Sequence, residues 1–412
     1  MSRHDLSARG NALAASPAMP TYLLEHFPRL DDLYDAETNP GGYIPLCIAE
    51  NRLVWDLLAP KVRGPRHVPP DALGYGDMVG PRPFREVLAS FLERWVLGRP
   101  VDPDHTAVLA GAGSVLEILF YALGDPGDGV LVPTPSYAGF WMDLELRDEL
   151  HIVPVHTRAD DGFRLTPELL DAAVEAADVP VRALLYTTPN NPLGTVASRE
   201  ELEAVLTWAE GRGIHVVFDE VYALSVYGDA PFVSAAQLRP SLGEHTHIVW
   251  AFSKDMAASG LRCGALISEN EGVLATVNAL SYWACVSGDT LHLLEGWLSD
   301  EAWLQRYVPE MRRRLGASAS RVVERLTAAG VPVTGGQAGF FVLVDLRAHL
   351  DAPTVEAEDR LWRRLLDAGI NLTPGVAIRS EEPGLFRLCF ASVPLEALDV
   401  AIDRLLAVLH AG

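Results

Sequence analysis

Hydrophobic and polar positions follow two periods along the middle of the chain. Short apolar runs, typical of buried strands, occur at 106–110, 129–132, 151–155, 181–186, 215–218 and 248–252. Stretches with helical spacing lie between several of them, at 115–123, 166–177 and 199–212. This alternation predicts an α/β fold with a mostly parallel sheet.

The flanking segments differ from this pattern. Residues 1–40 hold four prolines and predict an arm that packs on a neighbour. A helical stretch at 271–329 leads to strands and helices that predict a second, smaller unit. We therefore expect an N-terminal arm and part of a small domain at 1–45, a large domain at 46–295, and a small α+β domain at 296–412.

Composition narrows the functional classes. The chain has 412 residues, of which 49% are hydrophobic and 21% charged, as in a soluble enzyme. Its net charge of −22 argues against nucleic acid and anionic membranes as partners. The four cysteines form no CxxC pair, so we expect neither a metal site nor disulfides, and a reducing cytoplasm. No apolar stretch suggests a signal peptide or a membrane span.

One lysine stands out chemically. The chain has only two lysines, Lys61 and Lys254, against thirty-one arginines. Lys254 follows the apolar run at 248–252, at the end of a predicted strand where α/β sheets place their chemistry. A buried lysine can lose its proton and attack a carbonyl, which arginine cannot do. We interpret Lys254 as the Schiff-base lysine of a pyridoxal phosphate (PLP) enzyme; the alternative is a surface lysine.

Polar residues at other strand ends are compatible with the same cofactor. Asp219 ends a strand, where a carboxylate can keep a pyridine nitrogen protonated, although it can instead cap the next helix. Tyr222 lies one helical turn further and can hydrogen-bond a phenolic oxygen or simply pack. Asn191 lies in a turn fixed by two prolines and a glycine, and can present its amide to the same oxygen.

Further residues suit the phosphate, the ring and a carboxylate. The Gly-Ala-Gly-Ser turn at 111–114 precedes a predicted helix and is a candidate phosphate cradle. Arg262 offers a planar fork for phosphate, and Tyr137 can stack on a ring. Arg387, on a predicted strand, suits bidentate binding of an α-carboxylate. Each arginine taken alone is more often a surface residue.

These residues carry a family resemblance across nearly the whole chain. Asn-Pro-Leu-Gly at 191–194, Asp-Glu-Val-Tyr at 219–222 and Ser253-Lys254 with Arg262 resemble the fold-type I PLP enzymes of the aspartate aminotransferase superfamily (aminotransferase class I/II). That fold has a large domain with a mostly parallel seven-stranded sheet and a smaller α+β domain. It implies a homodimer in which the glycine-rich loop at 74–80 reaches the partner's cofactor.

A narrower resemblance is to 1-aminocyclopropane-1-carboxylate (ACC) synthases. It rests on Leu-Cys-Ile-Ala-Glu-Asn at 46–51, Pro-Thr-Pro-Ser-Tyr-Ala-Gly-Phe at 133–140, Ile-Val-Pro-Val-His at 152–156, Phe-Asp-Glu-Val-Tyr-Ala at 218–223, Phe-Ser-Lys-Asp-Met at 252–256, and Leu-His-Leu-Leu at 291–294 followed by Leu-Ser-Asp-Glu at 298–301. These enzymes cleave S-adenosylmethionine (SAM) and release 5′-methylthioadenosine.

The resemblance assigns roles to individual residues. Lys254 is the Schiff-base lysine and general base, and Glu50 matches an active-site glutamate. The ring is served by Asp219, Tyr222 and Asn191, with Tyr137 stacked on it. The phosphate is served by Ala112, Gly113, Ser253 and Arg262. Arg387 holds the substrate carboxylate, with Glu50 and Tyr137 also on the substrate side.

Several positions depart from the ACC synthase pattern. Arg52 replaces a glutamine, and Met78 replaces the tyrosine that reaches the neighbouring subunit, a role that we expect Tyr75 to take over as in aminotransferases. Ser136 replaces the first of two tyrosines, and Trp141-Met142 replaces Asp-Arg.

The departures leave the outcome of the reaction open. The four-carbon unit of SAM is either closed to ACC or captured by a second substrate, such as an unsaturated heterocycle. An amino-acid aminotransferase is the alternative enzyme. A PLP-dependent regulator is disfavoured, because the chain is acidic and has no helix-turn-helix module.

Overall fold

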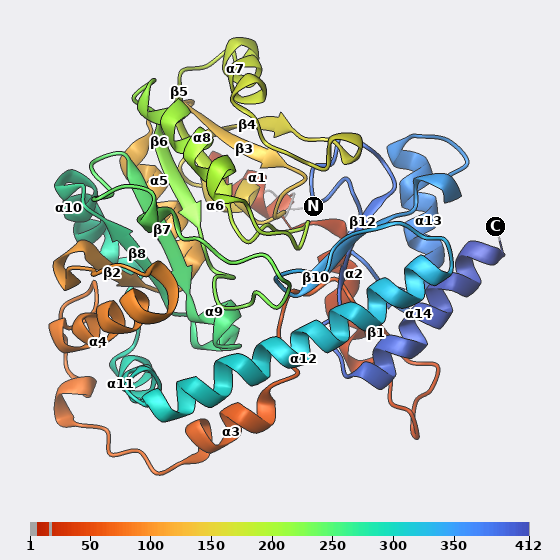
Figure 1. The fold of residues 1–412 in the computed structure, drawn as a ribbon, viewed down its shortest axis with the longest axis horizontal. Coiled ribbons are helices and arrows are strands. Elements are labelled where there is room, and N and C mark those ends of the chain that lie inside the picture. Colours follow the sequence, from red (N-terminus) through yellow and green to blue (C-terminus); the bar gives the residue numbers. More distant parts are fainter. Residues whose placement is uncertain (1–5, 16–18, 412) are drawn as a thin grey trace.

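A seven-stranded sheet forms the centre of the molecule in the computed structural model, which describes residues 6–15 and 19–411 (Figure 1). Its strand order is β2-β8-β7-β6-β5-β3-β4. Only β8 runs antiparallel to its neighbours, so the sheet is mostly parallel, as the sequence predicts. The strands are β2 (Thr106–Leu109), β3 (Gly129–Thr134), β4 (His151–His156), β5 (Val181–Thr187), β6 (His215–Asp219), β7 (Thr246–Ala251) and β8 (Gly264–Ser268).

Alternate residues of the strands enter two separate cores. Leu184, Val216 and Ile248 belong to one hydrophobic cluster, whereas Leu185 and Val217 belong to the other. Helices cover both faces of the sheet, so the strands read as continuous apolar runs rather than as an alternating pattern. The first cluster includes α7 (Pro167–Ala176), α8 (Arg199–Glu210) and α4 (Arg82–Leu92), and the second includes α5 (Ala112–Leu123), α6 (Phe140–Glu145) and α10 (Glu271–Leu280).

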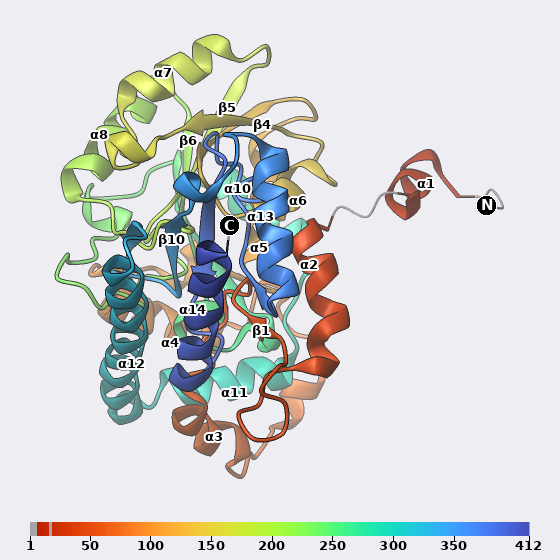
Figure 2. The same ribbon diagram turned by 90° about the vertical axis from the view of Figure 1, so that its right-hand side faces the viewer.

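The C-terminal part forms its own small sheet beside the large one (Figures 1 and 2). Three antiparallel strands lie in the order β12-β10-β9, with Leu343 opposite Arg387. A separate parallel pair joins β1, near the N-terminus, to β11. The elements are β1 (Ile44–Pro45), β9 (Val333–Gly335), β10 (Phe341–Asp345), β11 (Ile370–Asn371), β12 (Leu385–Cys389), α11 (Gly288–Leu298), α12 (Glu301–Ala328), α13 (Val355–Asp367) and α14 (Leu395–His410).

The N-terminal segment has little contact with the rest of the chain at its start. Helix α1 (Ala8–Ala15) buries no residue and stands apart from the body of the molecule (Figure 2), whereas α2 (Thr21–His26) buries Tyr22 and His26. Helix α3 (Trp55–Arg63) follows β1. The predicted arm extends over residues 1–5 and 16–18, which lie outside the described residues. The domain limits at 45/46 and 295/296 stay predictions.

Local features refine the predicted elements. Beyond β1 the chain still bonds to both neighbouring strands, because the Leu46 amide donates to Asn371 of β11 and its carbonyl accepts from Cys389 of β12. Helix α12 lies within the stretch of helical spacing predicted at 271–329 and ends at Ala328. Helix α5 begins at Ala112, three residues before the expected start, so the candidate phosphate cradle is its first turn. Among the described helices, none has the length and apolar character to cross a membrane.

Candidate active site

The carboxyl ends of β5, β6 and β7 bring three of the predicted site residues to one edge of the sheet. Thr187 pairs with Asp219, and Asp219 pairs with Val249, so these strand ends are neighbours. The turn that holds Asn191 follows β5, Asp219 ends β6, and Lys254 follows β7. Parallel topology therefore converts three distant sequence positions into one site, as expected for an open α/β sheet.

Lys254 lies in the short helix α9 (Phe252–Asp255), directly after β7. Its Nζ donates a hydrogen bond of 2.8 Å to the carbonyl oxygen of Ala49. Burial, assisted by the positive charge of Arg387, lowers the pKa of Lys254 to about 8, although Glu50 and Asp219 oppose this shift. A substantial neutral fraction near neutral pH is what a nucleophilic or basic lysine requires.

Asp219 is a buried carboxyl group at the end of β6, and 6% of its surface is exposed. Burial raises its pKa to about 7, against a hydrogen bond from the Val221 amide and the positive charge of Lys254. A second cation close to the carboxyl group would favour its charged form. The carboxyl group is therefore suited to pairing with a protonated ring nitrogen.

Arg387 and Asn191 contact each other in the buried interior. Arg387 Nη1 donates to Oδ1 of Asn191 at 3.0 Å, and its Nη2 donates to the Cys47 carbonyl at 2.7 Å and to Thr373 Oγ1 at 3.0 Å. The guanidinium is buried, and its Nε finds no hydrogen-bond partner within the described parts of the chain. Such an arginine is fixed in place before any carboxylate binds.

Tyr222 presents a hydroxyl group that lacks a protein partner. Its ring is wedged edge-to-face against Phe340 and Phe341, with ring centres 5.2 and 5.4 Å apart. The buried hydroxyl makes no hydrogen bond to the residues that the structure describes. Because leaving a buried polar group unpaired is costly, this hydroxyl is suited to a ligand oxygen.

The amino end of α5 and Arg262 form an anion-binding corner. Arg262 Nη1 donates to the carbonyl of Ser259 at 3.1 Å, and its guanidinium covers Gly111. A Cβ at Gly111 would lie 2.5 Å from Nη2, so the Arg262 side chain would have to shift, and φ there is +92°, a backbone conformation that favours glycine. The first amides of α5, from Ala112 and Gly113, have no partner inside the helix.

Ser253 and Tyr137 are two further predicted site residues. Ser253 lies in α9 and is 8% exposed. The Tyr137 ring lies against Gly139, where any side chain would overlap it, and packs edge-to-face on Phe140 with ring centres 5.3 Å apart. Tyr137 is nevertheless 38% exposed, so part of its side chain remains accessible.

Glu50 is paired with Arg52, the residue that replaces the glutamine of the ACC synthase pattern, and it directly follows the residue that binds Lys254. One carboxylate oxygen accepts a bond from the Ser259 hydroxyl at 2.9 Å, and the other lies 3.3 Å from Arg52 Nη2. Ala49, whose carbonyl binds Lys254, directly precedes Glu50. The segment at 49–52 thus binds the lysine amine through Ala49 and carries a carboxylate, Glu50, paired with an arginine, Arg52.

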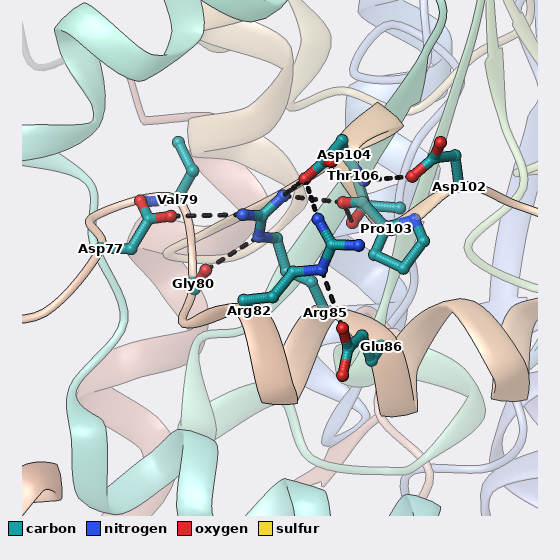
Figure 3. A network of polar contacts seen from close by, with 10 residues as sticks. All are labelled: Asp77, Val79, Gly80, Arg82, Arg85, Glu86, Asp102, Pro103, Asp104 and Thr106. Carbon is teal, nitrogen blue, oxygen red and sulfur yellow. Dashed lines mark hydrogen bonds and ion pairs between the residues drawn. The ribbon is translucent and has the colours of Figure 1, made fainter.

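Tyr75 does not join this cluster within the single chain: it is 99% exposed. The end of its loop is firmly held (Figure 3), because buried Arg85 donates to the Gly80 carbonyl at 3.0 Å and the Pro103 carbonyl at 2.7 Å, and contacts Asp77 at 3.3 Å. An anchored loop thus presents a fully exposed tyrosine.

Two carboxylates near the site were not among the sequence candidates. Asp143 on α6 faces the start of α5, and burial next to Glu117 raises its pKa to about 7. Asp255, the residue after Lys254, accepts bonds from the Leu224 amide, the Ser225 hydroxyl and the Trp250 indole. The Ser-Lys-Asp-Met stretch was a usable signal for Asp255. For Asp143 the signal was its position directly after Trp141-Met142, in the stretch compared with the ACC synthase pattern.

The fold and this lysine-centred site define a fold-type I PLP-dependent enzyme. The chain matches the aminotransferase class I and II family over residues 46–405, and it belongs to that family. Its cofactor is therefore pyridoxal 5′-phosphate.

Curated relatives refine the comparison. The chain is 39% identical to 1-aminocyclopropane-1-carboxylate synthase 3 of Oryza sativa subsp. japonica, covering 91% of this chain and 89% of that protein. It is 38% identical to synthase 4 of the same plant (91% and 84% covered) and 35% identical to synthase 9 of Arabidopsis thaliana (90% and 84% covered). The resemblance to ACC synthases is confirmed.

Solved structures agree on the fold. Thermus thermophilus aspartate aminotransferase with maleate superposes with a TM-score of 0.82 at 25% identity, covering 98% of this chain and 100% of that one. Thermotoga maritima aspartate aminotransferase gives a TM-score of 0.78 at 25% identity, with the same coverage. The predicted aspartate aminotransferase-like architecture is confirmed.

The residues present fit PLP. The unpartnered Tyr222 hydroxyl suits its phenolic oxygen, and Asp219 suits its ring nitrogen. The start of α5 with Arg262 suits its phosphate. Within the described ranges, no group of three or more His, Cys, Asp or Glu side chains is arranged to hold a metal ion.

Proposed function

We propose that this enzyme acts on S-adenosylmethionine, removing its α-proton and breaking its Cγ–S bond to release 5′-methylthioadenosine. The observation that carries the proposal is the lysine of lowered pKa, held 2.8 Å from the carbonyl that precedes Glu50, in a chain 35–39% identical to ACC synthases.

Each residue has a defined task in this proposal. Bound PLP supplies an electron sink for the α-carbon. Arg387, preset by Asn191 and Thr373, binds the substrate α-carboxylate and so orients the α-proton. Neutral Lys254 accepts that proton on Nζ. The Cγ–S electron pair leaves with sulfur as a neutral thioether, so the departing group itself needs no proton.

The carboxylate of Glu50 lies on the substrate side of the lysine. SAM carries a positive sulfonium, and a negative carboxylate favours binding of a cation. Arg52, whose Nη2 lies 3.3 Å from the Glu50 carboxylate, offsets part of that charge. The replacement of glutamine by Arg52 therefore changes the charge beside the substrate.

The fate of the four-carbon unit has two proposed routes. It is closed to ACC by intramolecular attack at Cγ, or it is captured by a second substrate, such as an unsaturated heterocycle. Trp141, a departure from the ACC synthase pattern, lies under the Arg379 guanidinium, whose centre is 4.9 Å from the ring. Trp141 and Met142 thus replace the two charged side chains, Asp and Arg, of that pattern.

We also propose a homodimer. Four large side chains are strongly exposed on the single chain: Leu73 (80%), Tyr75 (99%), Tyr282 (66%) and Trp283 (74%). The two segments that carry them line a common cavity of about 580 Å³. Exposed apolar surface of this kind marks an interaction site, and a second copy would bring Tyr75 to a neighbouring site.

Incubation with SAM and mass spectrometry of the products test the reaction. ACC formed from SAM alone supports ring closure, and methylthioadenosine formed only with an added acceptor supports capture. If SAM gives no methylthioadenosine under either condition, while an amino acid converts the cofactor to pyridoxamine phosphate, the enzyme is an aminotransferase and the proposal is wrong.

A further inference from the structure

Asp143 points toward the first turn of α5 from the neighbouring helix α6. A Cβ built on Gly113 would lie 3.2 Å from Oδ1 of Asp143, which places the carboxyl group beside the amides that open the helix. Within the described residues, no donor makes a hydrogen bond to this carboxyl group, and no cation forms an ion pair with it. An acidic group thus lies, without a protein partner, where the cofactor phosphate is expected.

The charges around Asp143 come from several elements. Glu117 on α5 disfavours its anionic form, and Arg262 in the turn before β8 favours it. Asp219 at the end of β6 and Tyr137 before α6 also lie close enough for Asp143 to raise their pKa values. Burial is the largest influence, and together with Glu117 it outweighs Arg262, raising the pKa of Asp143 to about 7.

We propose that Asp143 is a ligand of the PLP phosphate and that it binds as the neutral acid, donating its O–H to a phosphate oxygen. This inference rests on the placement of the phosphate at the amino end of α5. The other groups assigned there, the α5 amides and Arg262, donate hydrogen bonds at any ordinary pH. Asp143 would be the one member of the set whose ability to donate depends on pH.

The physical argument concerns the sign of the charge. A phosphate dianion next to a carboxylate in a partly buried site is repelled, whereas the same phosphate next to a carboxylic acid accepts a short, charge-assisted hydrogen bond. Binding of PLP therefore favours the protonated form of Asp143. By linkage, the affinity for PLP must fall as the pH rises through the pKa of Asp143 in the free protein, and binding must take up protons there.

Comparing PLP with pyridoxal isolates the phosphate. Both aldehydes react with Lys254, so titration of that amine cancels in the ratio of the two dissociation constants. The apoprotein is titrated with each compound between pH 6 and 9, and binding is followed by absorbance. We expect the preference for PLP over pyridoxal to fall as the pH rises above about 7, by up to about tenfold per unit.

Two variants separate Asp143 from a general charge effect. Asp143→Asn is neutral at every pH and keeps a donor, so its preference for PLP should not fall above pH 7. Asp148→Asn is the matched control: Asp148 is buried, its pKa is likewise raised to about 7, and Glu117 is likewise a cause. Asp148 should not contact the phosphate, so its variant should behave like the wild type.

The proposal is overturned if Asp143→Asn keeps the wild-type profile, or if Asp148→Asn flattens the profile equally. Calorimetry of the wild type at pH 8 in two buffers gives a second test that needs no variant. PLP should take up more protons than pyridoxal on binding, and equal uptake would refute the proposal. A wild-type protein that binds neither compound would instead reject the Lys254 site itself.

Discussion

Nη1 of Arg387 donates a 3.0 Å hydrogen bond to Oδ1 of Asn191, although the two residues lie 196 positions apart. The sequence assigns Asn191 to the cofactor and Arg387 to the substrate. Their contact joins the turn after β5 to β12 of the small sheet, so the two predicted binding functions would share one hydrogen bond. A substitution at either residue should therefore weaken the binding of both the cofactor and the substrate.

Replacing Asn191 by Ala tests this coupling. The variant should weaken PLP binding and also raise KM for the substrate, each by roughly tenfold, the effect of about 1.4 kcal/mol. Thr373→Val is the matched control, because it removes a different hydrogen bond to Arg387 and should raise KM alone. Dissociation constants for PLP and steady-state kinetics measure the two effects. An Asn191→Ala enzyme with unchanged KM would contradict the coupling.

The second prediction concerns the site of covalent attachment. Borohydride reduction of the PLP-loaded enzyme, followed by peptide mapping, should place the label on Lys254. The chain supplies a natural control in its only other lysine, Lys61, whose ammonium is bound to Asp300 at 2.6 Å. Lys254→Ala should abolish labelling and Lys61→Ala should preserve it. Label on Lys61 would refute the assignment.

The third prediction uses the pKa of Lys254. Only the neutral amine attacks the cofactor aldehyde, so the rate of PLP uptake by apoprotein should rise with pH with a midpoint near 8, well below the range of an ordinary lysine. The negative charge of Glu50 raises the pKa of Lys254, and Glu50→Gln should therefore move the midpoint down, by roughly half a unit. Stopped-flow absorbance gives the profile.

A substitution of an exposed glutamate provides the control for the measured pH midpoint of PLP uptake. Glu86 on α4 is exposed and paired with Arg82, and it is not among the groups that shift the pKa of Lys254, so Glu86→Gln should leave the midpoint in place. A Glu50→Gln profile that moves upward, or not at all, would contradict the predicted charge effect.

The site residues that the sequence predicts correctly as neighbours are those that follow parallel strands. Asn191, Asp219 and Lys254 each follow an apolar run, and neighbouring parallel strands end at the same edge. This reasoning needs only the order of strands. The roles of these residues stay predictions, because their positions alone do not reveal which ligand atom each one contacts.

Residues that reach the site from helices and loops escape such reasoning. Asp143 approaches through the packing of α6 on α5, and Ser259 binds Glu50 across 209 positions. Neither contact follows from a local period or motif, because side-chain packing between helices decides it. The reversal of β8 is similar: an apolar run does not specify strand direction.

The fourth prediction concerns Asp255, which fixes the turn that carries Lys254. Its fully buried carboxylate accepts three hydrogen bonds from the β7 residue Trp250 and from residues 224 and 225. Asp255→Ala leaves these donors unpaired and should lower the free energy of unfolding by about 3 kcal/mol or more. It should also slow PLP uptake, because the lysine loses its support.

Asp255→Asn provides a gentler comparison. The amide oxygen can replace Oδ2 for Leu224 and Trp250, while the Ser225 hydroxyl can rotate to accept a bond from the amide NH₂. The loss should then be roughly 1 kcal/mol. Urea unfolding measures both variants, and equal losses would show that hydrogen-bond geometry does not explain the role of Asp255.

The last prediction concerns stability in acid, at the end of the sheet opposite Lys254. His215 opens β6, and its Nδ1 lies 3.1 Å from Nε2 of buried His247, whose Nδ1 lies 2.9 Å from the Ser268 hydroxyl. Burial, together with the positive charge of neighbouring histidines, lowers the pKa of His215 to about 4 and that of His247 to about 3. Both rings are therefore neutral in the folded protein at pH 5.

The sign of the effect follows from linkage. An unfolded histidine takes up its proton near pH 6.5, so between that pH and about 4 the unfolded chain binds more protons than the folded one. The free energy of unfolding should fall as the pH falls through this window, by up to about 1.4 kcal/mol per unit for each ring. Above pH 6.5 these two rings should contribute no pH dependence.

His247→Gln should lower stability at pH 8 through lost packing but flatten the slope between pH 6.5 and 4, whereas the exposed His151→Gln should retain the wild-type slope. Urea unfolding across that range measures both, and a His247→Gln slope equal to that of the wild type would show that this buried ring does not carry the acid sensitivity.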